Sequence, residues 1–392
     1  MIVTQSVRLF PTKKQEKYFH KACSARTHIF NKAKEWDDLH YEETGERLTK
    51  RELTELIAGY KPEFHKDLPF TIEHHTYRDG MHAYFDARRR AFAKKGGWPK
   101  YQSNKYRRVK SFYVRTDGNR EFSTIVEDSP FVSIAGLSKV DPNRKYVLSD
   151  SQKRIPYYSL GIKSARVVWD GKYWSLQYTV DVDLPPVDSY TEPIGLDLGL
   201  ANYVTDSNGI TYDSVVSTPK YQRLQYRVKH YQRKLDRQRT AQKSEGREVP
   251  SKGYWRTRTK LQKVERDLAE YKKSFEISLA KEILKDNPST VVMENLSIKV
   301  MQSKASKGLS SSIHRARWYS LRLRIKHEQD KIQGTFILAD KYYPSTRKCS
   351  SCGAVKEDSL PLSVRVYSCS GCGMKLDRDL NAALNLKSLA YA

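Results

Sequence analysis

Residues 194–212 read IGLDLGLANYVTDSNGITY, which is a strand, a turn, a second strand and a further turn at Ser207-Asn208-Gly209. This order predicts a β-meander. The first strand is apolar apart from Asp197. A carboxylate inside an apolar strand is costly to bury unless it meets a cation or a hydrogen-bond donor. Asp197 is therefore the first candidate functional residue, and an acid paired inside the fold is the ordinary alternative.

A long basic helical segment follows the meander. Apolar residues at spacings of three and four run from Tyr221 to Leu235 and again from Leu261 to Phe275, with the polar stretch 242–253 between them. Two such seams joined by a loop predict an antiparallel helix pair. The outer faces of this hairpin are rich in lysine and arginine, which favours contact with a phosphate backbone over a merely solvated surface.

Two further carboxylates end short elements beyond the hairpin. Glu294 follows the apolar strand 289–293, and Asp379 lies at the predicted N-cap of a closing helix over 380–389. Taken singly, Glu294 fits an exposed strand-end acid and Asp379 fits a plain helix cap. Together with Asp197, the order Asp, Glu, Asp suggests a site that holds two Mg²⁺ ions for phosphodiester hydrolysis, because magnesium prefers hard oxygen ligands.

Four of the five cysteines form two pairs near the end of the chain. Cys349 and Cys352 enclose two residues, Cys369 and Cys372 enclose two more, and sixteen residues separate the pairs. This spacing predicts a tetrahedral four-thiolate site for one structural Zn²⁺ ion, with no open coordination position. A redox-active dithiol is the less favoured alternative.

The charge balance points to a polyanionic partner. Lysine and arginine number 71 against 45 acidic residues, a net charge of +26, and nucleic acid is the usual polyanion. The densest basic stretch, 86–110, holds ten cations, one acid and interleaved aromatic residues that can stack on bases. A solvated basic linker is the alternative. The candidate nucleic-acid contacts in this stretch are Arg88, Arg89, Arg90, Lys94, Lys95, Trp98, Lys100 and Tyr101.

The sequence also predicts where the protein acts. It contains no run of eighteen apolar residues, which excludes a membrane span by this criterion. Its start, MIVTQSVRLFPTKKQ, lacks the charged and then apolar pattern of a secretory signal. We therefore expect a cytoplasmic, nucleoid-associated prokaryotic protein.

Four stretches of the chain resemble the TnpB family of transposon-encoded, RNA-guided DNA nucleases, which are related to the small type V CRISPR effectors. These stretches are GLDLGLANYVTDSNG (195–209), VVMENLSI (291–298), YYPSTRKCSSCG (342–353) and YSCSGCGMKLDRDLNAALNL (367–386). They are similar to the family's three split RuvC motifs and its zinc ribbon. The N-terminal half agrees more loosely, through its first strand, the helix with Cys23-Ser-Ala-Arg26 and Asn31, and the segment GWPKY (97–101).

The resemblance implies a mixed α/β multidomain fold. A split ribonuclease H-like (RuvC) domain is expected over 191–346 and 374–392, with an inserted helical hairpin and a zinc ribbon over 347–373. A β-barrel wedge domain over 1–10 and 101–190 is expected before it, carrying a helical recognition insertion over 11–100.

The resemblance also implies an activity and its partners. The family pattern is an endonuclease that pairs a guide RNA from the transposon end with target DNA and cuts the double strand beside a short adjacent motif. Asp197, Glu294 and Asp379 resemble its three metal-binding carboxylates. Asp377 is expected to support Asp379, although on sequence alone either could be the ligand. The chain has no His-Asn-His segment, so one site is expected to cut both strands in turn.

Three alternatives stay open at this point. A DNA-joining transposase of the DDE type shares the fold but orders its acids Asp, Asp, Glu. A non-cutting guided repressor arises by loss of one or more acids, and all three are present in this chain. A small type V CRISPR effector differs only in using a CRISPR-derived guide, whose source lies outside the protein sequence.

Overall fold

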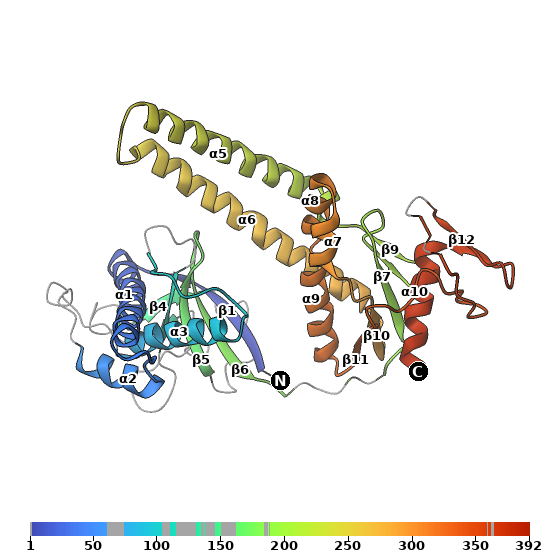
Figure 1. The fold of residues 1–392 in the computed structure, drawn as a ribbon, viewed down its shortest axis with the longest axis horizontal. Helices are drawn as coiled ribbons and strands as arrows, with labels where there is room; N and C mark the ends of the chain where they lie inside the picture. Colours follow the sequence, from blue (N-terminus) through green and yellow to red (C-terminus); the bar gives the residue numbers. More distant parts are fainter. Residues whose placement is uncertain are drawn as a thin grey trace. The chain divides into compact units, whose positions relative to one another are not determined.

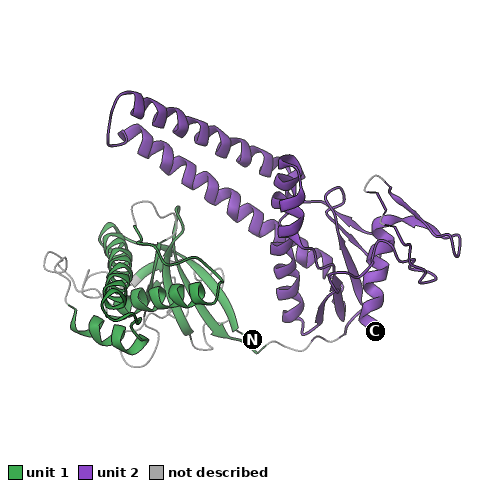
Figure 2. Ribbon diagram, in the orientation of Figure 1, with its two compact units in different colours: residues 1–183 green, residues 184–392 purple. Residues whose placement is uncertain are grey.

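The protein divides into two compact units, Met1–Asp183 and Leu184–Ala392 (Figures 1 and 2). Both come from a computed structural model. Parts of the expected barrel and recognition ranges, such as 61–73 and 115–130, lie outside the described residues. The structure describes residues 2–60, 74–103, 110–114, 131–134, 137, 146–149, 162–183, 187, 189–358, 360–361 and 364–392.

Unit 1 is built on an antiparallel sheet, whose described strands have the order β2-β5-β6-β1-β4-β3. The central strand β1 stops before Pro11, which lacks the backbone N–H that a ladder needs. β5 and β6 form a hairpin in which the Asp170 carboxylate accepts the backbone N–H groups of Lys172 and Tyr173. The strands are β1 (Ile2–Phe10), β2 (Lys110–Val114), β3 (Phe131–Ser133), β4 (Tyr146–Ser149), β5 (Ile162–Trp169) and β6 (Trp174–Asp181).

The described helices of unit 1 are α1 (Lys13–Thr44), α2 (Lys50–Gly59) and α3 (His74–Phe92). Reciprocal capping boxes start α1 and α2, because Thr12 and Thr49 each exchange hydrogen bonds with the residue three positions on. α1 packs on the sheet through Phe19, whose ring lies 5.7 Å from Phe112 and 5.1 Å from Trp174.

The sequence predicts Arg88, on α3, as a candidate nucleic-acid contact, but the structure buries it. Arg88 is only 6% exposed, and its side chain pairs with the buried Asp37 of α1 and donates to the Leu48 carbonyl oxygen at 2.6 Å. Tyr84 donates to the same Asp37 carboxylate at 2.5 Å. A buried charge needs a partner of opposite sign, so Arg88 ties α3 to α1 and is not available to nucleic acid.

Unit 2 contains a mixed sheet with the order β11-β10-β7-β8-β9. β10 runs parallel to both β11 and β7, whereas β8 and β9 continue antiparallel from β7. The predicted meander over 194–212 is therefore confirmed. The strands are β7 (Ile194–Leu198), β8 (Val204–Asp206), β9 (Thr211–Tyr212), β10 (Thr290–Met293) and β11 (Thr335–Leu338).

The predicted helical hairpin is also confirmed. A short helix η4 (Val215–Ser217) leads into α5 (Pro219–Ser244), which packs along α6 (Lys252–Ile283). The seam between them contains Tyr221, Leu224, Val228, Val264 and Leu268. The hairpin projects from the rest of unit 2 (Figure 1), and many side chains of α5 and α6 are exposed.

The remaining helices of unit 2 cover its sheet and end the chain. They are α7 (Ile298–Lys304), α8 (Lys307–Ala316), α9 (Trp318–Lys331), α10 (Arg378–Ser388) and the short η5 (Leu389–Tyr391). A small two-stranded sheet, β12 (Val366–Ser368) with β13 (Lys375–Asp377), precedes α10. Apolar side chains of α6, α8 and α9, among them Leu279, Ile313 and Leu321, form one core with the sheet. Among the described residues, no helix is long and apolar enough to cross a membrane.

Candidate functional site

Asp197 and Glu294 lie at the carboxyl ends of two neighbouring strands. Asp197 is the fourth residue of β7, and Glu294 directly follows β10, the parallel neighbour of β7. The Glu294 backbone N–H extends this pairing by donating to the Leu196 carbonyl oxygen at 3.4 Å. Parallel pairing therefore brings two acids that are almost a hundred residues apart in sequence to one edge of the sheet.

Asp379 reaches the same edge from the first turn of α10. The N-cap of α10 is Asp377 and not Asp379, which corrects the predicted cap. The Asp377 carboxylate accepts the backbone N–H groups of Asp379 (2.9 Å) and Leu380 (3.0 Å). Asp377 is therefore engaged in capping, and the Asp379 carboxylate lies close enough to Asp197 to raise the pKa of Asp197.

Neighbouring carboxylates act electrostatically on Asp197. Burial is the largest cause that raises the pKa of Asp197, which is 6% exposed, and the nearby Glu294 and Asp379 raise it further. Burial also raises the pKa of Glu294, to about 7, against the Leu198 backbone N–H and the Arg378 guanidinium, which lower it. A buried acid such as Asp197, with other carboxylates beside it, disfavours its own ionisation unless a cation enters.

Three polar neighbours of the acids were not predicted as site residues. Asn202 donates to Asp379 Oδ2 at 3.0 Å, and Arg365 Nη1 lies 3.7 Å from the same oxygen. Arg378 lies close enough to lower the pKa of both Asp197 and Glu294. Arg378 could have been noticed as the cation between two aspartates, whereas Asn202 and Arg365 carry no signal of this kind in the sequence.

The four clustered cysteines meet as their spacing predicts. The Sγ atoms of Cys349 and Cys372 are 3.7 Å apart, those of Cys352 and Cys369 are 3.6 Å apart, and all four lie within 4.8 Å of one another. Four sulfurs at about 2.3 Å from a tetrahedral zinc ion are separated by about 3.8 Å. Backbone N–H groups, first that of Cys372, lower the pKa of the Cys369 thiol to about 6. The cluster therefore fits a structural zinc ion.

Seven of the eight candidate nucleic-acid contacts in unit 1 are exposed; Arg88 is the exception described above. Trp98 and Tyr101 are both exposed, with the Arg47 guanidinium 4.6 Å from the Trp98 ring centre. Asn31 on α1 exchanges two hydrogen bonds with the backbone of Gln102, at 2.8 and 2.9 Å, and so fixes the segment that carries these aromatic residues.

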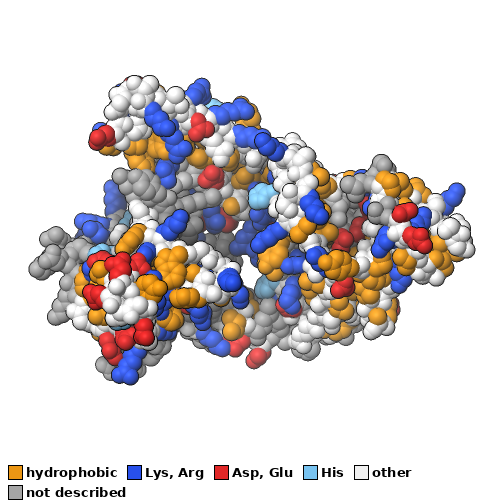
Figure 3. All heavy atoms as spheres, in the orientation of Figure 1, with side chains coloured by type: hydrophobic (Ala, Val, Ile, Leu, Met, Phe, Trp, Pro, Cys, Tyr) orange, Lys and Arg blue, Asp and Glu red, His pale blue; other side chains and the backbone are white. Residues whose placement is uncertain are grey.

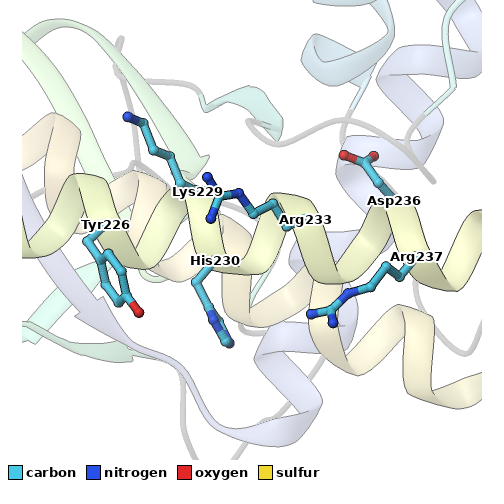
Figure 4. Close-up of a pocket in the computed structure, with 6 residues that line it drawn as sticks. All are labelled: Tyr226, Lys229, His230, Arg233, Asp236 and Arg237. Carbon is cyan, nitrogen blue, oxygen red and sulfur yellow. The ribbon is translucent and has the colours of Figure 1, made fainter.

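A second basic surface lies along α5 in unit 2. Six side chains of this helix line a pocket, and Figure 4 shows them as Tyr226, Lys229, His230, Arg233, Asp236 and Arg237. Tyr226 is 70% exposed. Lysine and arginine side chains are also visible along the hairpin in the space-filling view (Figure 3). Cations with an exposed aromatic ring are typical of surfaces that bind a nucleic-acid strand.

Two family models match parts of the chain that contain the candidate site residues of unit 2. Residues 318–386 match the family model "Cas12f1-like, TNB domain", and residues 175–305 match the model "Probable transposase". The first of these spans the cysteine cluster and Asp379, and the second spans Asp197 and Glu294.

Relatives of known name are similar over parts of the chain. A protein of Streptomyces pristinaespiralis is 25% identical over 307 residues, which cover 77% of this chain and 67% of that protein. InsQ of Escherichia coli K12 is 24% identical over 234 residues, which cover 56% of this chain and 54% of InsQ. Both names contain the words RNA-guided DNA endonuclease. The TnpB-like protein L79 of a mimivirus is 33% identical over 100 residues, which cover 24% of this chain and 18% of L79.

Two solved structures share the fold, and each superposes on almost the whole chain. The superposition on a cryo-EM structure of a Cas12f1–sgRNA–target DNA complex covers 95% of this chain and 81% of the Cas12f1 chain, with a TM-score of 0.54 at 13% sequence identity. The superposition on the mini-RNA-guided endonuclease CRISPR-Cas phi3 covers 100% of this chain and 92% of the phi3 chain, with a TM-score of 0.50 at 9% sequence identity. The mixed α/β architecture is thus that of the compact effectors. The two family models, the named relatives and this shared fold agree with the resemblance of the chain to the TnpB family of RNA-guided nucleases.

Proposed function

We propose that the chain is an RNA-guided DNA endonuclease that cuts double-stranded DNA at the site formed by Asp197, Glu294 and Asp379. One observation carries this proposal. β7, β10 and α10 bring the three acids to one sheet edge, where burial and their mutual repulsion raise the pKa of Asp197. A fold that concentrates negative charge in this way is suited to divalent cations.

The donor set fits magnesium. Hard carboxylate oxygens are the ligands that Mg²⁺ prefers, and two Mg²⁺ ions held by these acids would supply an activated water and charge stabilisation of the leaving oxygen. Asp197 and Glu294 are presented by strand ends, and Asp379 by the first turn of α10. In this proposal Asp377 is a helix cap that sets the direction of Asp379, because its carboxylate is engaged with the backbone.

The finer domain assignment belongs to the same proposal. We assign 191–346 and 374–392 to a split RuvC-like domain and 347–373 to a zinc ribbon. Parallel pairing of β11, β10 and β7, with α10 packed on β7, supports the first assignment. We also assign a wedge barrel to 1–10 and 101–190 and a recognition insertion to 11–100, where α1, α2 and α3 lie.

We propose guide RNA and double-stranded target DNA as the partners. The net charge of +26 and the exposed cations of unit 1 and α5 support binding to phosphates. The solved Cas12f1 neighbour is a complex with sgRNA and target DNA. Action on nucleoid DNA in a prokaryotic cytoplasm, with a guide transcribed from the transposon end, completes the proposal.

The deciding experiment compares four alanine variants in cleavage of guided target DNA. Asp197→Ala, Glu294→Ala and Asp379→Ala each remove a proposed metal ligand and are expected to abolish magnesium-dependent cutting. DNA binding should stay equal or rise slightly, since each substitution removes a charge that repels phosphate. Asp377→Ala is the matched control and should keep partial activity.

Two results of this experiment would change the proposal. If Asp377→Ala is inactive while Asp379→Ala still cuts, the third ligand is Asp377. If all four variants cut like the wild type, the acids have a structural role only and the nuclease site lies elsewhere.

Sequencing of the RNA that co-purifies with the protein tests the guided class and the source of the guide. A discrete structured RNA from the transposon end supports the proposal, whereas a CRISPR-derived RNA assigns the chain to the small type V effectors. Absence of a discrete RNA, combined with strand-joining products, would favour the DNA-joining transposase.

A further inference from the structure

Two buried amides project from one face of α10. Asn381 is 0% exposed and Asn385 is 2% exposed. They are four residues apart, so their side chains lie one above the other on the helix surface. Neither residue is a cysteine ligand or one of the three acids, and the proposed chemistry uses neither of them.

Both amides bind the backbone of the first cysteine pair. Asn381 Oδ1 accepts the Ser350 N–H at 2.9 Å, and its Nδ2 donates to the Lys348 carbonyl oxygen at 2.8 Å. Asn385 Nδ2 donates to the same Lys348 oxygen at 2.7 Å and to the Ser345 oxygen at 2.8 Å. Lys348 and Ser350 flank Cys349, so the amides hold the loop that presents one of the four sulfurs.

The hydrogen bonds between these two amides and the cysteine loop are costly to break, because the two asparagines are buried. A buried amide or backbone carbonyl that loses its partner costs about 1–3 kcal/mol. Asn381 and Asn385 make four such bonds to one loop. We therefore expect the loop over residues 345–350 and α10 to behave as one rigid part.

The opposite side of α10 carries the third acid. Asp379, Ala383 and Lys387 follow one another at four-residue spacing, and two positions along a helix turn the side chain by about 200°. Asp379 therefore points away from the Asn381 face. The helix lies against β7 so closely that a Cβ on Gly195 would come within 2.0 Å of the Ala383 carbonyl oxygen.

From this geometry we propose that Asn381 and Asn385 are positioning residues that make cation binding at Asp379 depend on the zinc-holding loop. The inference rests on the proposed function, in which Asp379 is a metal ligand. Without zinc, Cys349 is no longer held by its three partner thiolates, and the loop can leave the two amides. The first turn of α10 then loses its support on one side, and Asp379 loses its fixed position relative to Asp197.

The size of the effect follows from the way metal sites are built. Loss of a partner that orients a ligand typically lowers metal affinity about 10- to 100-fold. We expect the dissociation constant for a divalent cation at the three-acid site to rise by about this factor in Asn381→Ala and Asn385→Ala. Zinc content should stay close to that of the wild type, because all four thiolates are intact.

The test titrates Mn²⁺, as a paramagnetic substitute for Mg²⁺, into the full-length protein freed of nucleic acid, and counts bound ions by electron paramagnetic resonance. Asp379→Ala defines the signal that belongs to the three-acid site. Gln329→Leu is the matched control. Gln329 is also a fully buried amide in unit 2 and donates to the Pro288 carbonyl oxygen at 2.7 Å, but it contacts the loop before β10 and not the cysteine loop. It should bind Mn²⁺ like the wild type.

A second arm needs no substitution in α10. Removal of zinc from the wild type should weaken Mn²⁺ binding about as much as Asn381→Ala does, and reloading zinc should restore it. In the Asn381→Ala and Asn385→Ala double variant, zinc removal should add little further loss, because the connection is already broken. Half-saturating Mg²⁺ for DNA cutting should rise in parallel, while a mere loss of folded protein lowers only the amount of product.

The outcomes separate this inference from the function on which it rests. If Asp379→Ala binds Mn²⁺ like the wild type, the proposed metal site itself is wrong. If Asp379→Ala loses the signal while both asparagine variants and the zinc-free wild type keep wild-type affinity, the site stands and the positioning role is refuted. Additive losses from zinc removal and the asparagine substitutions would also refute it.

Discussion

Replacement of Glu294 by glutamine should stabilise the magnesium-free protein increasingly as the pH rises above 4.5. Burial raises the pKa of the Glu294 carboxyl from 4.5 to about 7. The folded protein therefore holds this proton more tightly than the unfolded chain does, so stability is full below pH 4.5 and falls as the pH rises toward 7. Glu294→Gln stays neutral throughout and escapes this loss.

The magnitude follows from the two pKa values. Each tenfold change in a proton equilibrium is about 1.4 kcal/mol, so the ionised Glu294 lowers the free energy of unfolding by about 3 kcal/mol at pH 8. Part of that loss is already present at pH 5.5. The gain of Glu294→Gln over the wild type should thus be about 2 kcal/mol larger at pH 8 than at pH 5.5. Glutamine can still accept the Leu198 N–H, so the local hydrogen bond is kept.

Hydrogen-exchange mass spectrometry over a urea series measures this gain in the full-length protein, at peptides that contain β7 and β10. The buffer is free of magnesium, and zinc content is checked at both pH values. Glu282→Gln is the control, since Glu282 is an exposed acid on α6 and its loss changes the net charge equally. A gain that is the same at both pH values, or no gain at all, would refute the argument that desolvation raises the pKa of Glu294.

Three further predictions concern packing, zinc and RNA. Gly195→Ala should destabilise unit 2 by about 1–3 kcal/mol in urea unfolding, because the added Cβ would clash with the backbone of α10. Gly308→Ala is the control: the added carbon has open space around it, so this variant should be neutral or slightly stabilising. Cys372→Ser should release zinc and reduce the hydrogen-exchange protection of residues 347–373, since structural zinc contributes folding free energy. A zinc content equal to that of the wild type, measured by elemental analysis of the variant, would contradict this prediction. Joint replacement of Arg89 and Arg90 by serine should weaken RNA binding and lower its salt slope by roughly two, and an unchanged slope in filter binding would exclude them as phosphate contacts.

Local patterns in the sequence predicted the parts of the molecule that follow from the spacing of residues along the chain. The meander over 194–212 and the hairpin seam follow from periodicity, and both are present in unit 2. The cysteine pairs close into one cluster because each pair and its turn are short-range features. A resemblance carried by the same motifs pointed to the family, and the two family models and the named relatives agree with it.

Other assignments depended on long-range contacts that no local pattern records. Arg88 looked like one cation among many in a basic stretch, yet Asp37, some fifty residues earlier, takes it into the core of unit 1. Asp377 and Asp379 are indistinguishable as cap and ligand by sequence, because a helix start can shift by two residues at little cost. The two backbone hydrogen bonds to Asp377 fix that start.

The sequence by itself determined the types of group the protein holds: acids in the order Asp, Glu, Asp, four thiols at the spacing of a zinc site, and an excess of cations. Only the tertiary structure decided which of these groups meet. Parallel pairing of β7 with β10 places Asp197 beside Glu294, and the close seating of α10 on Gly195 adds Asp379. The physical reason is that periodicity and spacing act over a few residues, whereas burial and charge coupling arise between side chains brought together by strand register and helix packing.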